Sequence, residues 1–108
     1  MGSEVFVDFV TGTTIERAFS AAVTRAQYDH GHSGYTGSIS EKSTFVEIPI
    51  PEDFNPEMEP IRRAKAWVSQ LINECDDRID DKWGPAGGAY VDIKDGKKLF
   101  VFFGWASS

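Results

Sequence analysis

The sequence predicts a single α+β domain over residues 1–108, with elements in the order strand, helix, strand, helix, strand, strand. Three observations support this prediction: two segments space their apolar residues as helices do, four segments are rich in Val, Ile and Phe, and turn residues separate them. At 108 residues and 41% hydrophobic content, the chain can form one core without metal or disulfide support. We expect a two-layer sandwich of two amphipathic helices on a small sheet, with a C-terminal β-hairpin.

The first predicted strand covers residues 4–10, where Asp8 interrupts a run of Val and Phe. Thr13 and Glu16 then have the spacing of a capping box, which marks the start of a helix. Apolar residues of the following segment repeat with the helical period: Ile15, Ala18, Phe19, Ala22, Val23 and Ala26. Gly31 is suited to end this helix, because glycine adopts a left-handed backbone at little cost.

The second strand and the second helix are predicted from proline as well as from periodicity. Residues 44–50 alternate as a half-buried strand does, and Pro49 either ends this strand or places it at a sheet edge. The helix begins at one of two residue–proline pairs, 55–56 or 59–60, since proline suits the first turn. We expect its apolar stripe to enter the core: Ile61, Ala64, Val68, Leu71, Ile72, Cys75 and Ile79.

A two-residue turn at positions 95–96, Asp-Gly, predicts a hairpin between strands 89–94 and 97–103. In the register of such a turn, Val91 lies opposite Phe100. The second of these strands is apolar on both of its faces, which indicates a central strand covered on both sides.

The charge and composition exclude several classes of function. The net charge is −6, the pI is about 4.8, and the basic residues are scattered, so a nucleic acid is not an expected partner. The single cysteine provides no internal disulfide, which favours a reducing compartment. Neither a bilayer-spanning apolar run nor a signal peptide is visible, and we expect a soluble, cytoplasmic protein without a membrane partner.

The segment after the first helix, residues 29–38, combines glycines, histidines, hydroxyl side chains and a carboxylate. Most connections between elements are shorter and need no such set of donors. Glycines allow backbone N–H groups to approach an anionic ligand closely. The alternative is a structural loop in which the glycines only permit tight turns.

A second Gly-rich segment, residues 83–88, precedes the hairpin. From the two segments together we predict one ligand-binding surface: His30, His32, Ser33, Tyr35, Thr36, Ser38, Glu41, Lys42, Trp83 and Pro85. A zinc site would use both histidines with Asp29, but ligands among glycines lack the rigid support of a catalytic zinc site. No nucleophile elbow is present either, and we expect no metal, no cofactor and no catalytic residue.

Three segments carry a resemblance to known proteins: YDHGHSGYTGSISEK at 28–42, DKWGPAG at 81–87 and FFGWASS at 102–108. Together they make the chain resemble uncharacterised small proteins of actinobacteriophages, of the mycobacteriophage type, over nearly its whole length. That group has no established activity, so the resemblance assigns no catalytic residue. It implies a viral protein that is made inside a bacterial host and directed at a host component.

The leading hypothesis is a non-enzymatic binding module that inhibits or sequesters a host protein or a small anionic, nucleotide-like molecule through the two Gly-rich segments. One alternative is a small enzyme that acts on a nucleotide or phosphoester, with His30 or His32 as general acid–base and Glu41 as its partner. Another alternative is a structural or homodimeric phage component whose interface contains Phe45, Trp105 and the hairpin edge.

Overall fold

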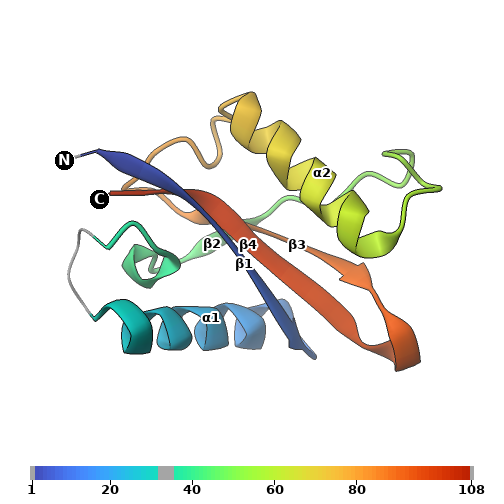
Figure 1. Cartoon of the computed structure of the whole chain (residues 1–108), viewed down its shortest axis with the longest axis horizontal. Helices are drawn as coiled ribbons and strands as arrows, with labels where there is room; N and C mark the ends of the chain where they lie inside the picture. Colours follow the sequence, from blue (N-terminus) through green and yellow to red (C-terminus); the bar gives the residue numbers. More distant parts are fainter. Residues whose placement is uncertain (1, 32–35, 108) are drawn as a thin grey trace.

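The computed structural model describes residues 2–31 and 36–107. Its elements follow the predicted order, with two short 3-10 turns added (Figure 1). They are β1 (Ser3–Gly12), α1 (Ile15–His30), η1 (Ile39–Glu41), β2 (Phe45–Glu47), α2 (Pro60–Asn73), β3 (Ala86–Asp92), η2 (Lys94–Gly96) and β4 (Lys98–Ser107). The α+β class and the C-terminal hairpin of β3 and β4 are confirmed.

The four strands form one sheet in the order β1-β4-β3-β2. β4 pairs antiparallel with both β1 and β3, and the short β2 pairs parallel with β3. The strand that is apolar on both faces is therefore central, as its sequence predicts. Likewise, the strand that precedes Pro49 lies at an edge of the sheet.

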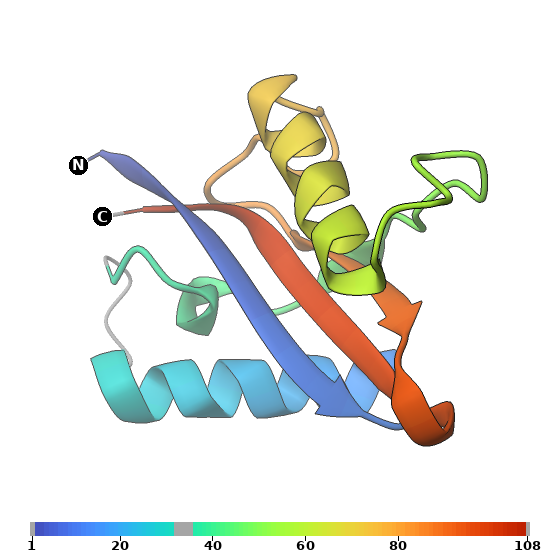
Figure 2. The same cartoon turned by 45° about the vertical axis from the view of Figure 1, so that its right-hand side comes forward.

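The two helices lie on opposite faces of this sheet, as both views show (Figures 1 and 2). Successive side chains of β4 point to opposite faces. Phe100 and Phe102 pack with α1, whereas Val101 and Phe103 pack with α2. Each face of the sheet is thus covered by one helix, and the two helices do not share a face.

The ends of the helices follow local signals. Thr14, and not the threonine before it, caps α1: its hydroxyl oxygen accepts the Arg17 N–H at 3.2 Å. Gly31 ends the helix with φ 80°, as predicted. α2 uses the second of the two predicted starts, with Glu59 as the cap and Pro60 as the first helical residue. Among the described residues, no helix has the length and apolar character needed to cross a membrane.

The prediction that Cys75 packs in the core is wrong. α2 ends at Asn73, and Cys75 is exposed with φ 50°. The amides of Cys75 and Asp76 donate to the carbonyls of Ile72 and Leu71, which is the Schellman pattern of a helix end. The helical spacing of apolar residues therefore continues in the sequence to Ile79, although α2 itself ends at Asn73.

The predicted register of the hairpin is also wrong, by one residue. Tyr90, and not Val91, pairs with Phe100. The connection has three residues instead of two, because the Ile93 N–H donates to the carbonyl of Lys97. A shift of one residue moves a side chain to the other face of the sheet, so Val91 packs under α2.

Candidate functional site

The structure describes seven of the ten predicted ligand-binding residues, and His32, Ser33 and Tyr35 lie outside the described residues. His30 is the last residue of α1. The others lie in the two Gly-rich segments: Thr36, Ser38, Glu41 and Lys42 after α1, and Trp83 and Pro85 before β3. Their contacts show which polar groups are already engaged within the protein.

The hydroxyl side chains of residues 36–40 bind one another. Oxygen atoms of Thr36, Ser38 and Ser40 lie 2.7 to 3.0 Å apart in a triangle. The Thr36 hydroxyl also donates to Oε2 of Glu41 at 2.9 Å, and the Gly37 amide donates to the same oxygen at 2.8 Å. Gly37 has φ 67°, a conformation that glycine adopts without strain. The segment is held by internal hydrogen bonds.

The Glu41 carboxylate joins this segment to the end of the central strand. Its Oε1 accepts the amide of Ser107 at 3.1 Å and the hydroxyl of Ser107 at 2.6 Å. Burial acts to raise the pKa of Glu41, but the hydrogen bonds from Ser107, Thr36 and Gly37 outweigh it and hold this pKa below its ordinary value. Such a carboxylate is a poor proton acceptor, and it has little capacity left for a ligand.

Lys42 connects the two Gly-rich segments. The residue is only 4% exposed, and its ammonium donates to the carbonyls of Lys82 at 3.0 Å and Gly84 at 2.9 Å. Burial lowers the pKa of Lys42, and the charges of Glu41 and Asp81 partly offset this. The two segments do come together, as the proposed common surface requires, but Lys42 is engaged in holding them.

The second segment contributes an exposed aromatic ring. Trp83 is 62% exposed, and the ammonium of Lys82 lies 5.7 Å from its ring centroid. Pro85 is half-buried and leads directly into β3. Trp83 is therefore the large side chain of this segment that a partner can reach.

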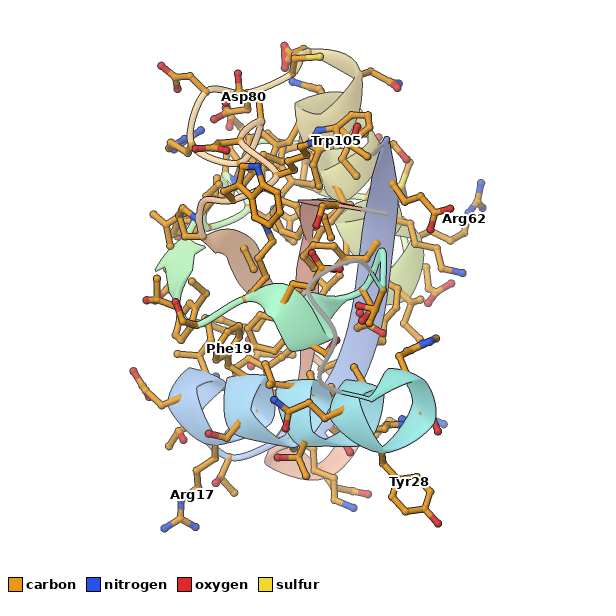
Figure 3. The ribbon with its side chains drawn as sticks, turned by 90° about the vertical axis from the view of Figure 1, so that its left-hand side faces the viewer. Arg17, Phe19, Tyr28, Arg62, Asp80 and Trp105 are labelled. Atoms are coloured by element: carbon orange, nitrogen blue, oxygen red, sulfur yellow. The ribbon has the colours of Figure 1, made fainter. Side chains whose placement is uncertain are left out.

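A concavity of about 290 Å³ lies between β1 and the C-terminal half of α1, and we call it the edge groove. Figure 3 shows the C-terminal end of α1, near Tyr28, on the side of the sheet where β1 lies. The edge groove is lined by Val7, Asp8, Phe9, Val10, Ala22, Arg25, Ala26, Asp29, His30 and Ser38. Two predicted site residues, His30 and Ser38, belong to it.

One side of the edge groove is the open edge of β1, a ten-residue strand that pairs with β4 and with no other described strand. Along an antiparallel strand, the N–H and C=O groups of one residue point to one neighbouring strand, and those of the next residue point to the other. In β4 the odd-numbered residues point away from β1. The Lys97 carbonyl, just before β4, accepts the Ile93 N–H, and at the other end the main chain of Ser107 bonds Glu41 and Gly37. The β1 residues that direct main-chain groups to the open edge are therefore Ser3, Val5, Val7, Phe9 and Thr11.

Asp8 lies in the edge groove on the α1 face of the sheet. It is half-buried, and within the described part of the chain its carboxylate makes no hydrogen bond or ion pair. Burial raises the pKa of Asp8, and the positive charges of Arg25 and His30 offset only part of this effect. In the sequence, Asp8 is noticeable as a charged residue within an apolar strand, but the sequence does not show that it faces a groove.

On its other face, β1 presents apolar side chains that α2 does not cover. Val5 and Val7 are each 42% exposed, although both belong to a sheet strand. Trp105 lies opposite Val5 in the ladder, and no described residue accepts a hydrogen bond from its buried indole N–H. An apolar strip therefore runs along the same edge as the groove.

The described residues contain no group of three His, Cys, Asp or Glu side chains placed to hold a metal ion. Comparisons of the chain with models of protein families, with curated proteins and with solved structures found no match. The geometry of the site therefore has to carry the functional argument.

Proposed function

We propose that the protein is a non-enzymatic binding module that accepts an extended segment of another protein along the open edge of β1. The observation that carries this proposal is the edge itself: a ten-residue strand that, among the described strands, pairs on one side only and borders the edge groove. An added strand would gain main-chain hydrogen bonds from this edge and side-chain contacts on both faces of the sheet.

The composition of β1 supports a binding edge. Soluble proteins often protect exposed edges with lysine, proline, bulges or inward-pointing charges. β1, with the sequence SEVFVDFVTG, contains no lysine and no proline, and it pairs with β4 without a bulge. Its one inward charge, Asp8, discourages indiscriminate pairing while leaving the edge accessible.

The Gly-rich segments have a supporting role in this proposal. The contacts of Glu41 and Lys42 are internal, and they fix the segment that brings Ser38 to the edge groove. Of the two ligand classes expected from the sequence, a host protein and a small anionic molecule, the strand edge favours the protein. Sequestration of a host protein through one of its extended segments is the form of inhibition that we propose.

The experiment selects peptides from a displayed random library on the immobilised protein and compares variants by fluorescence anisotropy. Val7→Pro removes an amide that faces the open edge, so the ladder with β4 is retained. We expect the selected peptides to bind Val7→Pro at least tenfold more weakly than the wild-type protein. Thr24→Ala is the control, because Thr24 lies on α1 outside the edge groove, and it should bind the peptides unchanged. Circular dichroism of each variant reports whether it is folded.

Amide hydrogen exchange gives a second, direct measurement of strand addition. The amides of Val5, Val7 and Phe9 should exchange fast in the free protein and slowly in the complex. The amides of Phe6 and Asp8, which face β4, should be protected in both states. Binding that leaves the three outward amides unprotected would contradict the proposal.

A further inference from the structure

We infer that the segment bound along β1 carries a lysine or arginine directly across from Asp8, between apolar residues that cover Val7 and its neighbours. This inference rests on the proposed strand addition and names the chemistry of the partner.

The first argument is the state of the Asp8 carboxylate. It is half-buried and has no hydrogen-bond or ion-pair partner among the described residues. Arg25 and His30 of α1 line the same groove, but neither forms an ion pair with this carboxylate. A strand laid along β1 would remove more water from this carboxylate, which is costly unless a cation or a donor replaces that water. A cation directly opposite is the favourable cross-strand partner.

The second argument is the alternation of side chains along an added strand. Successive residues of that strand would point to opposite faces of the sheet. On the α2 face they would meet the exposed side chains of Val5 and Val7, followed by the half-buried Phe9. On the α1 face the central residue would meet Asp8 in the edge groove. The complementary pattern is therefore apolar, cationic, apolar.

Charge also distinguishes this partner from a second copy of the chain. β1 has two carboxylates, Glu4 and Asp8, and no lysine or arginine, so a second β1 cannot provide the cation. Each copy has a net charge of −6, which opposes self-association and attracts a basic segment over longer distances. These charges favour a basic segment of a different protein.

The test uses three nine-residue peptides that alternate valine and threonine and differ only in a central lysine, glutamine or glutamate. Fluorescence anisotropy measures their affinity for the wild-type protein, Asp8→Asn and Asp8→Lys. We expect the lysine peptide to bind the wild-type protein about fivefold more tightly than the glutamine peptide, the size of one cross-strand ion pair. Asp8→Asn should remove this difference, and Asp8→Lys should prefer the glutamate peptide. Glu16→Gln, an equal change of charge at an exposed site on α1, should leave the preference intact.

The possible results separate the inference from the proposed function. Equal binding of all three peptides, with protection of the Val5, Val7 and Phe9 amides, would overturn the inference and retain strand addition. Absence of binding, or binding without that protection, would overturn the proposed function. Protection of the same amides without peptide, together with a dimer in sedimentation, would show that a second copy occupies the edge and would overturn the inference.

Discussion

Two half-buried carboxylates, Glu41 and Asp8, have opposite surroundings. Glu41 accepts hydrogen bonds from Thr36, Gly37 and Ser107, and its pKa is lowered. Asp8 makes no hydrogen bond or ion pair within the described ranges, and burial raises its pKa. The first carboxylate is used by the protein to hold itself together, whereas the second is left available beside an open strand.

This difference teaches where to look for a binding site in a chain of this kind. The segment with the richest set of polar residues uses many of them internally, as the triangle of hydroxyl groups shows. The groove beside β1 has a plainer composition, but within residues 2–31 and 36–107 the outer edge of β1 pairs with no strand and the Asp8 carboxylate forms no ion pair. A functional site is indicated by groups that lack partners more than by the number of polar residues.

The largest expected effect is the loss of stability in Glu41→Ala. Removal of the carboxylate takes away the acceptor that the Thr36 hydroxyl, the Gly37 amide and the main chain and hydroxyl of Ser107 share. The Gly37 amide keeps its second acceptor, the carbonyl of Ser107. We expect the free energy of unfolding to fall by roughly 3 kcal/mol, since several hydrogen bonds to one charged group are lost together. Urea denaturation measures this value. The exposed Glu47 is the control, and Glu47→Ala should change stability by less than about 0.5 kcal/mol. Equal effects of the two variants would contradict a structural role for Glu41.

Lys42→Met should have the next largest effect. The methionine keeps an apolar stem of similar length but leaves the carbonyls of Lys82 and Gly84 without their donor. We expect a loss of about 2 kcal/mol in the free energy of unfolding, measured by urea denaturation. Hydrogen exchange should also speed up around Gly84 in this variant. If exchange there is unchanged, Lys42 does not hold the two segments together.

Asp8→Asn should act in the opposite direction. The unpaired carboxylate disfavours the folded state at neutral pH, so its removal should raise the free energy of unfolding by up to about 1 kcal/mol. The same variant should lose its preference for a cationic peptide. Thermal denaturation at pH 7 measures the first effect and anisotropy the second. A variant that is less stable than the wild-type protein would show that Asp8 has a structural partner.

The pH dependence of stability should separate the two carboxylates. The pKa of Asp8 is raised in the folded state, so its destabilising effect is present at neutral pH and disappears as the pH falls through that folded pKa. The pKa of Glu41 is lowered, so its contribution is present above its unfolded pKa and is lost as the pH falls through its folded pKa. Urea denaturation between pH 7 and the acid range measures the free energy of unfolding of each variant. The stability advantage of Asp8→Asn over the wild-type protein should shrink as the pH decreases. Glu41→Gln should show the reverse trend, with its disadvantage shrinking at low pH.

The smallest expected effect comes from the Asp76 carboxylate, which pairs with the exposed side chain of Arg78. Arg78 donates to both oxygens of Asp76 and lowers the pKa of Asp76 to about 2. Because solvent screens this pair, Asp76→Asn should reduce stability by less than about 1 kcal/mol at pH 7. Any such contribution should vanish between about pH 4 and pH 2, where the folded protein takes up the proton. A loss of stability as large as that of Glu41→Ala would show that solvent does not screen the pair of Asp76 and Arg78.

The sequence alone determined the local features of this protein. Gly31 marked the end of α1, and the sequence narrowed the start of α2 to two residue–proline pairs, one of which is Glu59-Pro60, because backbone preference and capping depend on neighbouring residues. The helical periods predicted both helices, and the apolar character of both faces of β4 predicted its central place. These features depend on contacts within a few residues or on a simple period, and a sequence displays both.

The tertiary structure alone decided how the two helices divide between the faces of the sheet and how the hairpin pairs. It also decided the roles of the polar residues, because their partners are distant in the chain: Glu41 bonds Ser107, 66 residues away, and Lys42 bonds Gly84, 42 residues away. Asp8 has the same appearance in the sequence whether it faces water or a groove. Only the position of α1 beside β1 places it in a groove where, among the described residues, its carboxylate forms no ion pair or hydrogen bond.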